Sequence, residues 1–428
     1  MTIRNLLLVL CQRVKRSFTV AELAMALAFL AYTLANNGGF MHFNYHVHLA
    51  EAFLQGKLYL LNPPAWLTEL AWYQGRPYVY YGPLPSVLLL PLVAIFHESL
   101  NLARICTVLG AINVGLVWRL LERLGCSTKT TAWLTAVFAV GSVQFWVSSY
   151  GNTWLFAQLC ANCFLLTGAL EVLGKRRGWL IGLVLGSAVL SREACLLAIP
   201  CYLILLNLPR WRFPSSAGFF VGLSAWGLAA AWYNWARFGN PLDNGYLYAN
   251  QALWHPPHGS FSLHYLITML PAYFWRGPTF VPHPPFALLT DHGLSLFWTT
   301  PVFLLLFPAA NAILQGRAVR EATAEASKDE TVDSGARPTP HRYQPYRDRT
   351  VAVAAWSSLL PMAGLYLLYF WDGWRQFGAR YSLDYTPFIL IILGLYLKNN
   401  PTRCFQLLAV AAFLVNLWGI AYWRLSGW

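Results

Sequence analysis

The chain has 428 residues, of which 57% are hydrophobic and only 11% are charged, and its formal net charge is +13. This composition excludes a disordered chain and an ordinary soluble domain, because both have fewer apolar and more charged residues. Apolar runs of about 18–22 residues recur, which is the length that a helix needs to cross a bilayer. The sequence therefore predicts an all-α fold, a polytopic transmembrane helical bundle.

Eleven segments are predicted to span the membrane. Most of the 30 lysines and arginines then fall in loops on one side, which the positive-inside rule makes the cytoplasmic side and which places the N-terminus inside. All histidines except His341 fall on the outer side, so we expect the working face to be the outer one. The predicted spans are 18–35, 102–120, 131–149, 154–172, 179–193, 195–208, 215–235, 293–311, 351–371, 385–397 and 404–423.

The predicted parts of the chain differ in composition. Residues 312–350 have few apolar residues and mixed charge, which predicts a partly disordered cytoplasmic linker. Residues 1–17 carry a basic cluster without a small-residue cleavage site after it, which is typical of a cytoplasmic interfacial segment and not of a cleaved signal. The other parts are a transmembrane module at 18–311, with outer loops at 36–101 and 236–292, and a C-terminal three-span part at 351–428.

The first outer loop, residues 36–101, is much longer than about 15 residues, and such loops are usually functional or disordered. At 100° per residue, its first part forms an amphipathic helix that could lie at the membrane surface with its polar side facing a site. A second juxtamembrane helix is expected at Leu84–Phe96, which is too short and too rich in proline to span the bilayer. The polar stripe of the first helix consists of Asn44, His48, Glu51 and Gln55. An interfacial helix without chemistry is the alternative.

The positive charge of the chain follows from its topology. Basic residues are scattered over short loops, where they contact lipid headgroups and set the orientation. No recognition motif accompanies them, so we expect membrane lipids as partners and no nucleic acid.

Polar and aromatic residues are concentrated in four regions of the predicted outer side. The first is the amphipathic loop helix, and the second is the passage GRPYVYYGPLPS. The third is the long aromatic stretch within 236–292. The fourth is WDGWRQFGARYSLDYTP, which places Asp372, Arg375, Arg380 and Asp384 between two spans.

These passages, in this order, resemble the GT-C glycosyltransferases, and in particular the bacterial relatives of protein O-mannosyltransferases and lipid A aminoarabinose transferases. The resemblance covers most of the chain except 312–350. It implies a GT-C-like fold in the bacterial inner (plasma) membrane. It also implies transfer of a sugar from a polyprenyl-phosphate carrier to an acceptor lipid, glycan or protein on the outer face. The landmarks are HLAEAFLQGKLYL, GPLPSVLLLP, CTVLGAINVGLVWRLLERLG, SREACLLAIP, YNWARFGNPLDNGY and FGARYSLDYTPF.

One position departs from the family pattern. Most members place an acidic residue just beyond the first span, where it acts as a base or orients the acceptor. Here Asn36, His42 and Asn44 occupy that neighbourhood, and the first acid is Glu51. The resemblance implies that Glu51, or a histidine beside it such as His48, has taken the role. The alternative is a non-catalytic GT-C-fold membrane subunit, or a lipid-binding partner in a membrane complex.

The chemistry of such a transfer requires three kinds of group. A base must take the proton of the acceptor, arginines must bind the leaving phosphate, and flat apolar surfaces must hold the sugar. For Arg380, an ion pair with Asp384 at i,i+4 is the alternative. The catalytic candidates are Glu51, His48 and Asn44, the phosphate- or carrier-binding candidates are Arg380, Arg375 and Arg192, and the sugar-binding candidates are Tyr80, Tyr81, Trp374 and Tyr381.

No cofactor is expected from the sequence. His42, His46, His48 and Glu51 are acceptable ligand types for a divalent metal. His46 and His48, however, point to different faces of one helix, so a single helix cannot present all of them. A transporter fits less well, because the charged residues gather at the predicted outer edge and transporter sites favour the membrane midplane.

Overall fold

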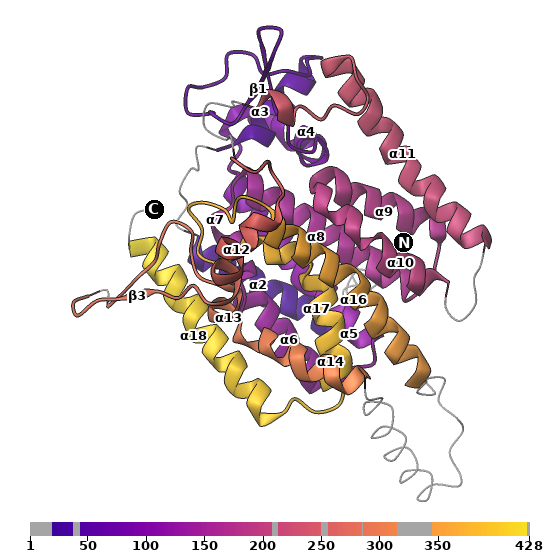
Figure 1. The fold of residues 1–428 in the computed structure, drawn as a ribbon, viewed down its shortest axis with the longest axis vertical. Helices are drawn as coiled ribbons and strands as arrows, with labels where there is room; N and C mark the ends of the chain where they lie inside the picture. The colour runs from indigo at the N-terminus through magenta and orange to yellow at the C-terminus, as the bar shows by residue number, and fades with distance from the viewer. Residues whose placement is uncertain are drawn as a thin grey trace, which may run out of the picture.

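The computed structural model describes residues 19–36, 43–207, 213–249, 256–284, 286–314 and 345–425. The predicted segment 1–17, His42 and most of the predicted linker 312–350 lie outside these residues. The described chain is mostly helical, and its named strands form two small antiparallel hairpins (Figure 1). An all-α fold is therefore confirmed at the level of secondary-structure class.

Among the residues that the structure describes, four helices are long and apolar enough to cross a membrane by themselves. They are α5 (Leu102–Arg123), α8 (Thr153–Val172), the part Asp348–Leu368 of α16 (Pro345–Leu368), and α18 (Arg403–Leu425). A fifth span results if α6 (Thr128–Val140) and α7 (Gln144–Tyr150), which are bent by 49°, are counted together. These helices indicate a membrane protein, while the eleven crossings stay a prediction.

Among the remaining predicted spans, 215–235 lies in the long helix α11 (Phe213–Phe238), which is less apolar than the four helices above, and the others are shorter or broken helices in the described chain. The predicted span 195–208 begins as a 3₁₀ helix, and 293–311 is divided among three short elements, since Pro301 interrupts it. The helical elements within each of these two predicted spans are too short to cross a bilayer alone. Each would cross only together with a neighbouring element. Outside the first outer loop, the other described α-helices are α2 (Val20–Ala35), α9 (Gly178–Ser191), α10 (Ile199–Leu206), α11 (Phe213–Phe238), α12 (Leu266–Phe274), α13 (Leu296–Thr299), α14 (Leu306–Leu314) and α17 (Thr386–Leu397).

Glycines allow α9 and α11 to pack with their backbones in contact. A Cβ atom at Gly182 of α9 would lie 1.9 Å from the carbonyl oxygen of Phe219. One at Gly222 of α11 would lie 2.0 Å from the carbonyl oxygen of Trp179. Small residues at such spacing are typical of helix pairs in membranes, where close approach replaces the hydrophobic driving force.

The first outer loop forms a cap at one end of the bundle, which we define as residues 43–101. It contains α3 (Tyr45–Leu54), β1 (Ala71–Tyr73), β2 (Arg76–Tyr78), α4 (Leu84–Phe96) and the 3₁₀ helix η1 (His97–Ser99). Helices are thus present at both places where the sequence predicts them in this loop. Figure 1 shows α3 and β1 at the opposite end of the molecule from α14.

The C-terminal end of α11 joins the cap to the bundle. Arg237 donates a hydrogen bond to the carbonyl oxygen of Val79 at 2.9 Å, and the ring of Phe238 lies 5.2 Å from that of Tyr78. This contact fixes the cap over the ends of the helices.

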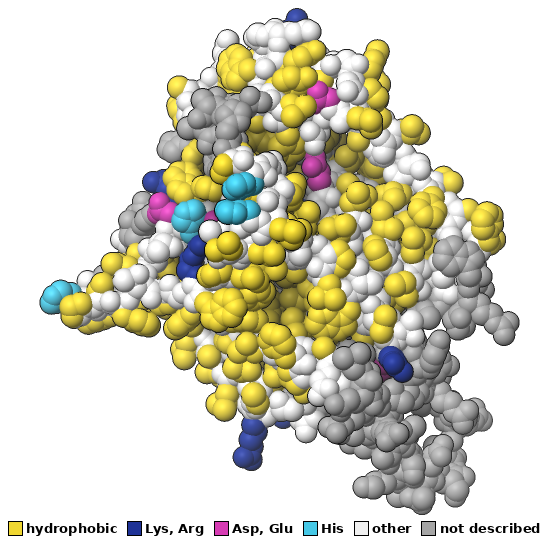
Figure 2. All heavy atoms as spheres, viewed as in Figure 1, with side chains coloured by type: hydrophobic (Ala, Val, Ile, Leu, Met, Phe, Trp, Pro, Cys, Tyr) yellow, Lys and Arg dark blue, Asp and Glu magenta, His cyan; other side chains and the backbone are white. Residues whose placement is uncertain are grey.

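Hydrophobic side chains cover most of the face drawn in Figure 2, and few charged side chains interrupt them. On α18, for example, Leu407 is 72% exposed and Leu414 is 63% exposed. A soluble protein rarely exposes such large apolar areas, whereas a helix that faces lipid does. The surface therefore agrees with the candidate spans.

Candidate functional site

A carboxylate of the cap, Glu69, lies where the cap meets the bundle. Its backbone N–H donates to the hydroxyl of Tyr45 at 3.0 Å, and its carboxylate accepts a hydrogen bond from the hydroxyl of Tyr81. That hydroxyl in turn accepts a hydrogen bond from the indole N–H of Trp154 at 2.9 Å. Glu69 is therefore held jointly by α3, by the segment after β2 and by the first turn of α8.

Burial changes the acidity of Glu69. Removal from water raises the pKa of its carboxyl above the usual value, although the hydrogen bond from Tyr81 and the charge of Arg380 act in the opposite direction. The same burial raises the pKa of the Tyr81 hydroxyl, so Tyr81 stays a hydrogen-bond donor. A carboxylate whose pKa is raised toward neutrality is a better proton acceptor than an ordinary one.

Arg380 lies in the 3₁₀ helix η7 (Arg380–Asp384) and is only 6% exposed. Its guanidinium carbon lies 5.5 Å from the ring centre of Trp154 and 5.1 Å from that of Tyr381. Its Nε donates to the side-chain oxygen of Gln376 at 3.1 Å. Its two terminal nitrogens have no hydrogen-bond or ion-pair partner among the residues that the structure describes. Free guanidinium donors held against two aromatic rings in a largely buried residue suit an anion such as a phosphate.

Arg192 lies against the same ring but is paired with a carboxylate. Its guanidinium carbon is 5.3 Å from the ring centre of Tyr381. Its Nε and Nη2 donate to Oδ2 of Asp384 at 3.1 and 2.9 Å, and Nη2 also donates to the hydroxyl of Tyr366 at 3.1 Å. The sequence analysis gave an ion pair with Asp384 as the alternative role of Arg380. That prediction is wrong, because Asp384 pairs with Arg192. Residues 380–384 form a 3₁₀ helix, in which positions i and i+4 do not share a face.

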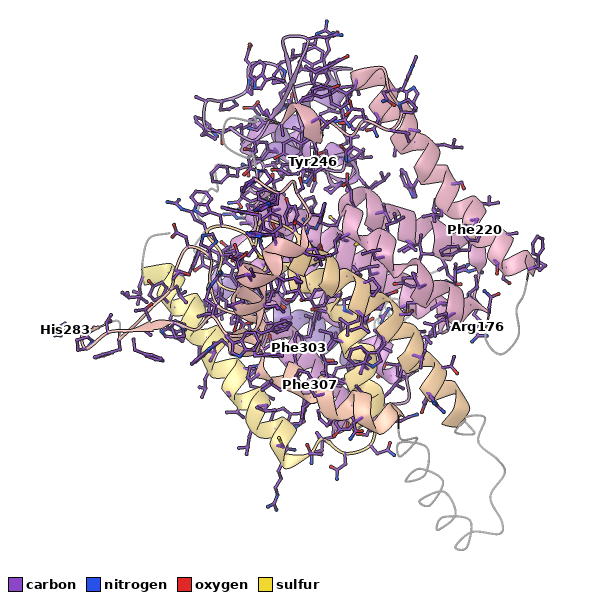
Figure 3. The ribbon with its side chains drawn as sticks, in the orientation of Figure 1. Arg176, Phe220, Tyr246, His283, Phe303 and Phe307 are labelled. Carbon is purple, nitrogen blue, oxygen red and sulfur yellow. The ribbon has the colours of Figure 1, made fainter. Side chains whose placement is uncertain are left out.

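Aromatic rings line the space around these charged groups. The ring centre of Tyr80 lies 4.6 Å from that of Tyr81 and 4.8 Å from that of Tyr246. Tyr246 is 46% exposed, and Figure 3 shows it between the cap and the bundle. The charges of Arg192, Glu69 and Arg380 all act on the hydroxyl of Tyr369, so these groups lie within electrostatic range of one tyrosine.

Two of the predicted catalytic candidates, Glu51 and His48, lie toward η1. Glu51 contacts His97 at 3.3 Å, and His48 contacts Glu98 at 3.2 Å. Asn44 is buried at the N-terminus of α3. The polar stripe of α3 therefore faces η1, and no described contact joins these residues to Arg380. Their catalytic role stays a prediction.

The predicted carrier- and sugar-binding residues are divided between two places. Arg192, Arg380, Tyr80, Tyr81 and Tyr381 belong to the region just described. Arg375 instead lies over the ring of Trp374, at 4.8 Å from its centre, and Trp374 is 39% exposed. That pair is on the surface of the loop that leads to Arg380.

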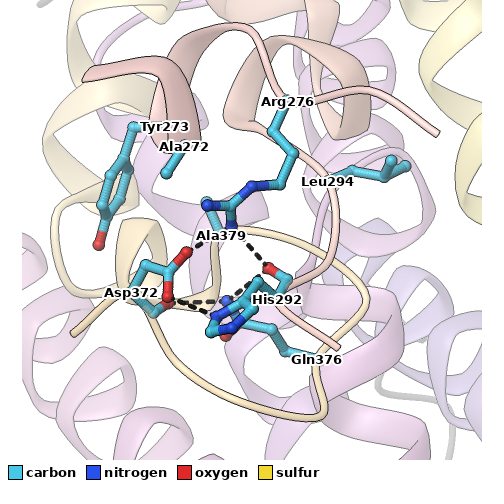
Figure 4. A pocket seen from close by; sticks show the side chains of 8 residues that line it. All are labelled: Ala272, Tyr273, Arg276, His292, Leu294, Asp372, Gln376 and Ala379. Carbon is cyan, nitrogen blue, oxygen red and sulfur yellow. Dashed lines mark hydrogen bonds and ion pairs between the residues drawn. The ribbon is translucent and has the colours of Figure 1, made fainter. Parts of the chain in front are cut away.

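A second polar cluster adjoins Arg380 and is shown in Figure 4. The carboxylate of Asp372 contacts the guanidinium of Arg276, and its Oδ1 lies 2.8 Å from Nδ1 of His292. The side-chain nitrogen of Gln376 donates to the carbonyl oxygens of His292 and Asp372 at 3.0 and 2.7 Å. Both of its N–H bonds are thus used, so the Gln376 oxygen must face Arg380.

The described chain contains no group of three or more histidine, cysteine, aspartate or glutamate side chains that could hold a metal ion. The histidines of the loop helix turn to different partners, because His46 contacts the hydroxyl of Ser86 at 2.9 Å while His48 contacts Glu98. Burial lowers the pKa of His46 to about 3, so it stays neutral. His42 lies outside the described residues.

Among the residues of this region that were not singled out from the sequence are Glu69, Trp154, Gln376 and Tyr246. Glu69 precedes a hairpin whose turn is Gln74-Gly75, and it stands between the buried Leu67 and Leu70. An acid flanked by apolar residues in an aromatic loop was the available signal for it. Trp154 and Gln376 gave no such signal, because their roles depend on contacts with distant segments.

Comparison of the chain with protein-family models, curated proteins and solved structures found no match. The fold and the site define a mostly helical membrane protein with an aromatic, arginine-containing site beneath a cap. Its function has to be argued from the residues themselves.

Proposed function

We propose that this chain is a GT-C-like membrane glycosyltransferase, which transfers a sugar from a polyprenyl-phosphate carrier to an acceptor on the outer face of the bacterial inner membrane. The observation that supports this proposal best is the guanidinium of Arg380. It is buried between two aromatic rings, its terminal N–H groups have no described partner, and a carboxylate with a raised pKa lies within electrostatic range.

Each group would have one role in the transfer. The hydroxyl of the acceptor attacks the anomeric carbon of the sugar while the bond between that carbon and the phosphate oxygen breaks. Glu69 accepts the proton of the hydroxyl. Arg380 binds the phosphate through its planar pair of terminal N–H groups and stabilises the charge that develops on it as the carrier leaves. The rings of Tyr80, Tyr81 and Tyr246 contact the sugar.

In this proposal Glu69 takes the position of base that the sequence suggested for Glu51. Glu69 belongs to the hydrogen-bond chain that reaches Trp154, over which Arg380 lies, whereas Glu51 contacts His97. The family pattern of an acid just beyond the first span would then be met by an acid later in the same loop.

The experiment uses the purified full chain in lipid nanodiscs with polyprenyl-phosphate donors that carry radiolabelled sugars. Glu69→Gln should reduce sugar release by about 10²–10⁴-fold, as removal of a general base does. Glu51→Gln is the matched control and should retain turnover. Unchanged turnover in both Glu69→Gln and Arg380→Ala would refute the proposal.

The same assay separates the alternative. If the parent chain binds the carrier but releases no sugar from any donor, a non-catalytic lipid-binding subunit is the better explanation. Binding would be followed with the sugar-free polyprenyl phosphate, and loss of binding in Arg380→Ala would then still assign the phosphate site.

A further inference from the structure

A short hairpin projects sideways from the bundle and has no role in the site described above. Its strands β3 (Thr279–Phe280) and β4 (Ala287–Leu288) pair antiparallel, with Phe280 opposite Ala287. Figure 1 shows it reaching away from the helices, and Figure 3 labels His283 far out on it. A two-stranded hairpin is barely stable alone in water, so its projection needs an explanation.

The side chains of this hairpin are apolar and exposed. Phe280 is 72% exposed, Phe286 is 59% exposed and Leu288 is 38% exposed, and Trp275 just before the hairpin is 68% exposed. Residues 277–290 contain no lysine, arginine, aspartate or glutamate. Exposed aromatic residues in a stretch without charged side chains mark a surface that is covered by another apolar phase.

The segment that follows the hairpin, residues 294–299, positions it relative to α18. The side-chain nitrogen of Asn416 donates to the carbonyl oxygen of Thr299 at 2.7 Å. Gly419 faces the ring of Phe377, and a Cβ there would lie 2.0 Å from it. The backbone N–H of Leu294 donates to the carbonyl oxygen of Phe377 at 2.9 Å. Residues 294–299, which follow the hairpin, are therefore held against the C-terminal half of α18, partly through Phe377.

The last turns of α18 have the composition of a membrane–water boundary. The rings of Trp418 and Tyr422 lie 5.6 Å apart, and Arg424 stands in the final turn. Aromatic residues and a basic residue at the end of a span are typical of the interfacial region. One turn earlier, Leu414 and Leu417 are 63% and 60% exposed, as lipid-facing residues of a span would be.

We propose that the β3–β4 hairpin is an interfacial anchor, whose Phe280 and Phe286 insert at the boundary between the headgroups and acyl chains of the lipid bilayer. Its apolar surface continues the lipid-facing side of α18 at the level where that helix leaves the membrane. Uncharged aromatic residues fit this boundary, since their rings are buried there while the backbone of the hairpin stays near water.

The anchor also has a connection to the polar cluster of Asp372. Arg276 precedes the hairpin and His292 follows it, and both contact the carboxylate of Asp372. Insertion of the hairpin into lipid would therefore hold in place Arg276 and His292, the two residues that contact the carboxylate of Asp372. The anchoring itself does not depend on the proposed transferase activity.

The test is photo-crosslinking of the purified full chain in lipid nanodiscs, with p-benzoylphenylalanine in place of Phe280 or Phe286 and phospholipid as the only other reactant. The same replacement at Leu414 gives the positive control. Trp72 supplies the matched control, because it is an aromatic residue, 54% exposed, in the other two-stranded hairpin, which lies in the cap. Adducts are identified by mass spectrometry.

Phospholipid adducts at positions 280 and 286 should form with a yield similar to that at position 414. They should exceed the yield at position 72 by about tenfold, the preference expected for burial of one aromatic side chain. Adducts at position 414 without adducts at 280 and 286 would overturn the proposal. Crosslinks between two copies of the chain at 280 or 286, in place of lipid adducts, would also overturn it.

Discussion

Arg192 and Arg380 lie at almost the same distance from the ring of Tyr381, and they are used in opposite ways. Arg192 donates to Asp384 and to Tyr366, so its charge is neutralised within the protein. The guanidinium of Arg380 has a described hydrogen bond only from its Nε, to a neutral amide. The comparison teaches that residue type and position against an aromatic ring do not decide the role of an arginine. The role depends on whether a carboxylate reaches it.

The Arg192–Asp384 pair should carry the largest effect on stability. Asp384→Ala leaves the Arg192 charge buried without its partner, so we expect a loss of about 3–5 kcal/mol in the free energy of unfolding. Denaturant titration in detergent micelles measures it. Replacement of both residues by leucine should cost less than Asp384→Ala alone. An Asp384→Ala variant as stable as the parent would contradict the assigned difference between the two arginines.

Arg380 should show the reverse behaviour. Arg380→Ala is expected to reduce turnover by about 10²–10³-fold, as loss of a preorganised donor to a developing negative charge does. Its unfolding free energy should change much less than that of Asp384→Ala. Arg380→Lys keeps the charge but loses the planar fork, and should fall between the parent and the alanine variant. If Arg380→Ala lowers the free energy of unfolding and the folded variant keeps its turnover, Arg380 would have a structural role and no role in phosphate binding.

Gln376 accepts the hydrogen bond from Nε of Arg380, so its removal tests whether the orientation of Arg380 matters. Its removal in Gln376→Ala should raise the KM for the donor by about tenfold or more with a smaller change in kcat, since a hydrogen bond to a charged group contributes about 1.5–3 kcal/mol. Gln55→Ala, which removes an exposed amide from the end of α3, is the control. An equal effect of both variants would argue against positioning by Gln376.

The smallest expected effect concerns pH and Glu69. Since burial raises the pKa of this carboxyl, kcat should fall on acidification with a midpoint above that of an ordinary glutamate. The folded pKa lies above the unfolded one, so folding favours the protonated form, and this contribution to stability is lost as the pH rises through the folded pKa. Glu69→Gln should therefore be slightly more stable than the parent at neutral pH. Identical stability curves across this range would contradict the raised pKa.

Local pattern predicted the helical character of the chain well. The apolar runs coincide with helices, and the periodicity of the first outer loop predicted a helix where α3 is found. Both follow from interactions within a few residues along the chain, which the sequence displays directly. Length and composition could not decide how many of the shorter apolar helices cross the membrane.

The candidate site could be predicted only in part. The arginines and tyrosines at 80–81, 192 and 380–381 are recognisable in the sequence as polar and aromatic groups near predicted span ends. The proposal of Glu69 as the base in place of Glu51 rests on the contacts of Glu69 with Tyr81 and, through Tyr81, with Trp154. A periodic stripe on one helix cannot show such contacts.

What the sequence by itself determined was the class of the protein, a helical membrane protein, and the residue types available at one of its faces. Only the tertiary structure decided which groups meet. Arg192 and Asp384, for example, are 192 positions apart. The physical reason is that hydrophobic periodicity is a local property, whereas an ion pair or an unpaired guanidinium depends on how α8, η7 and the cap pack around one ring.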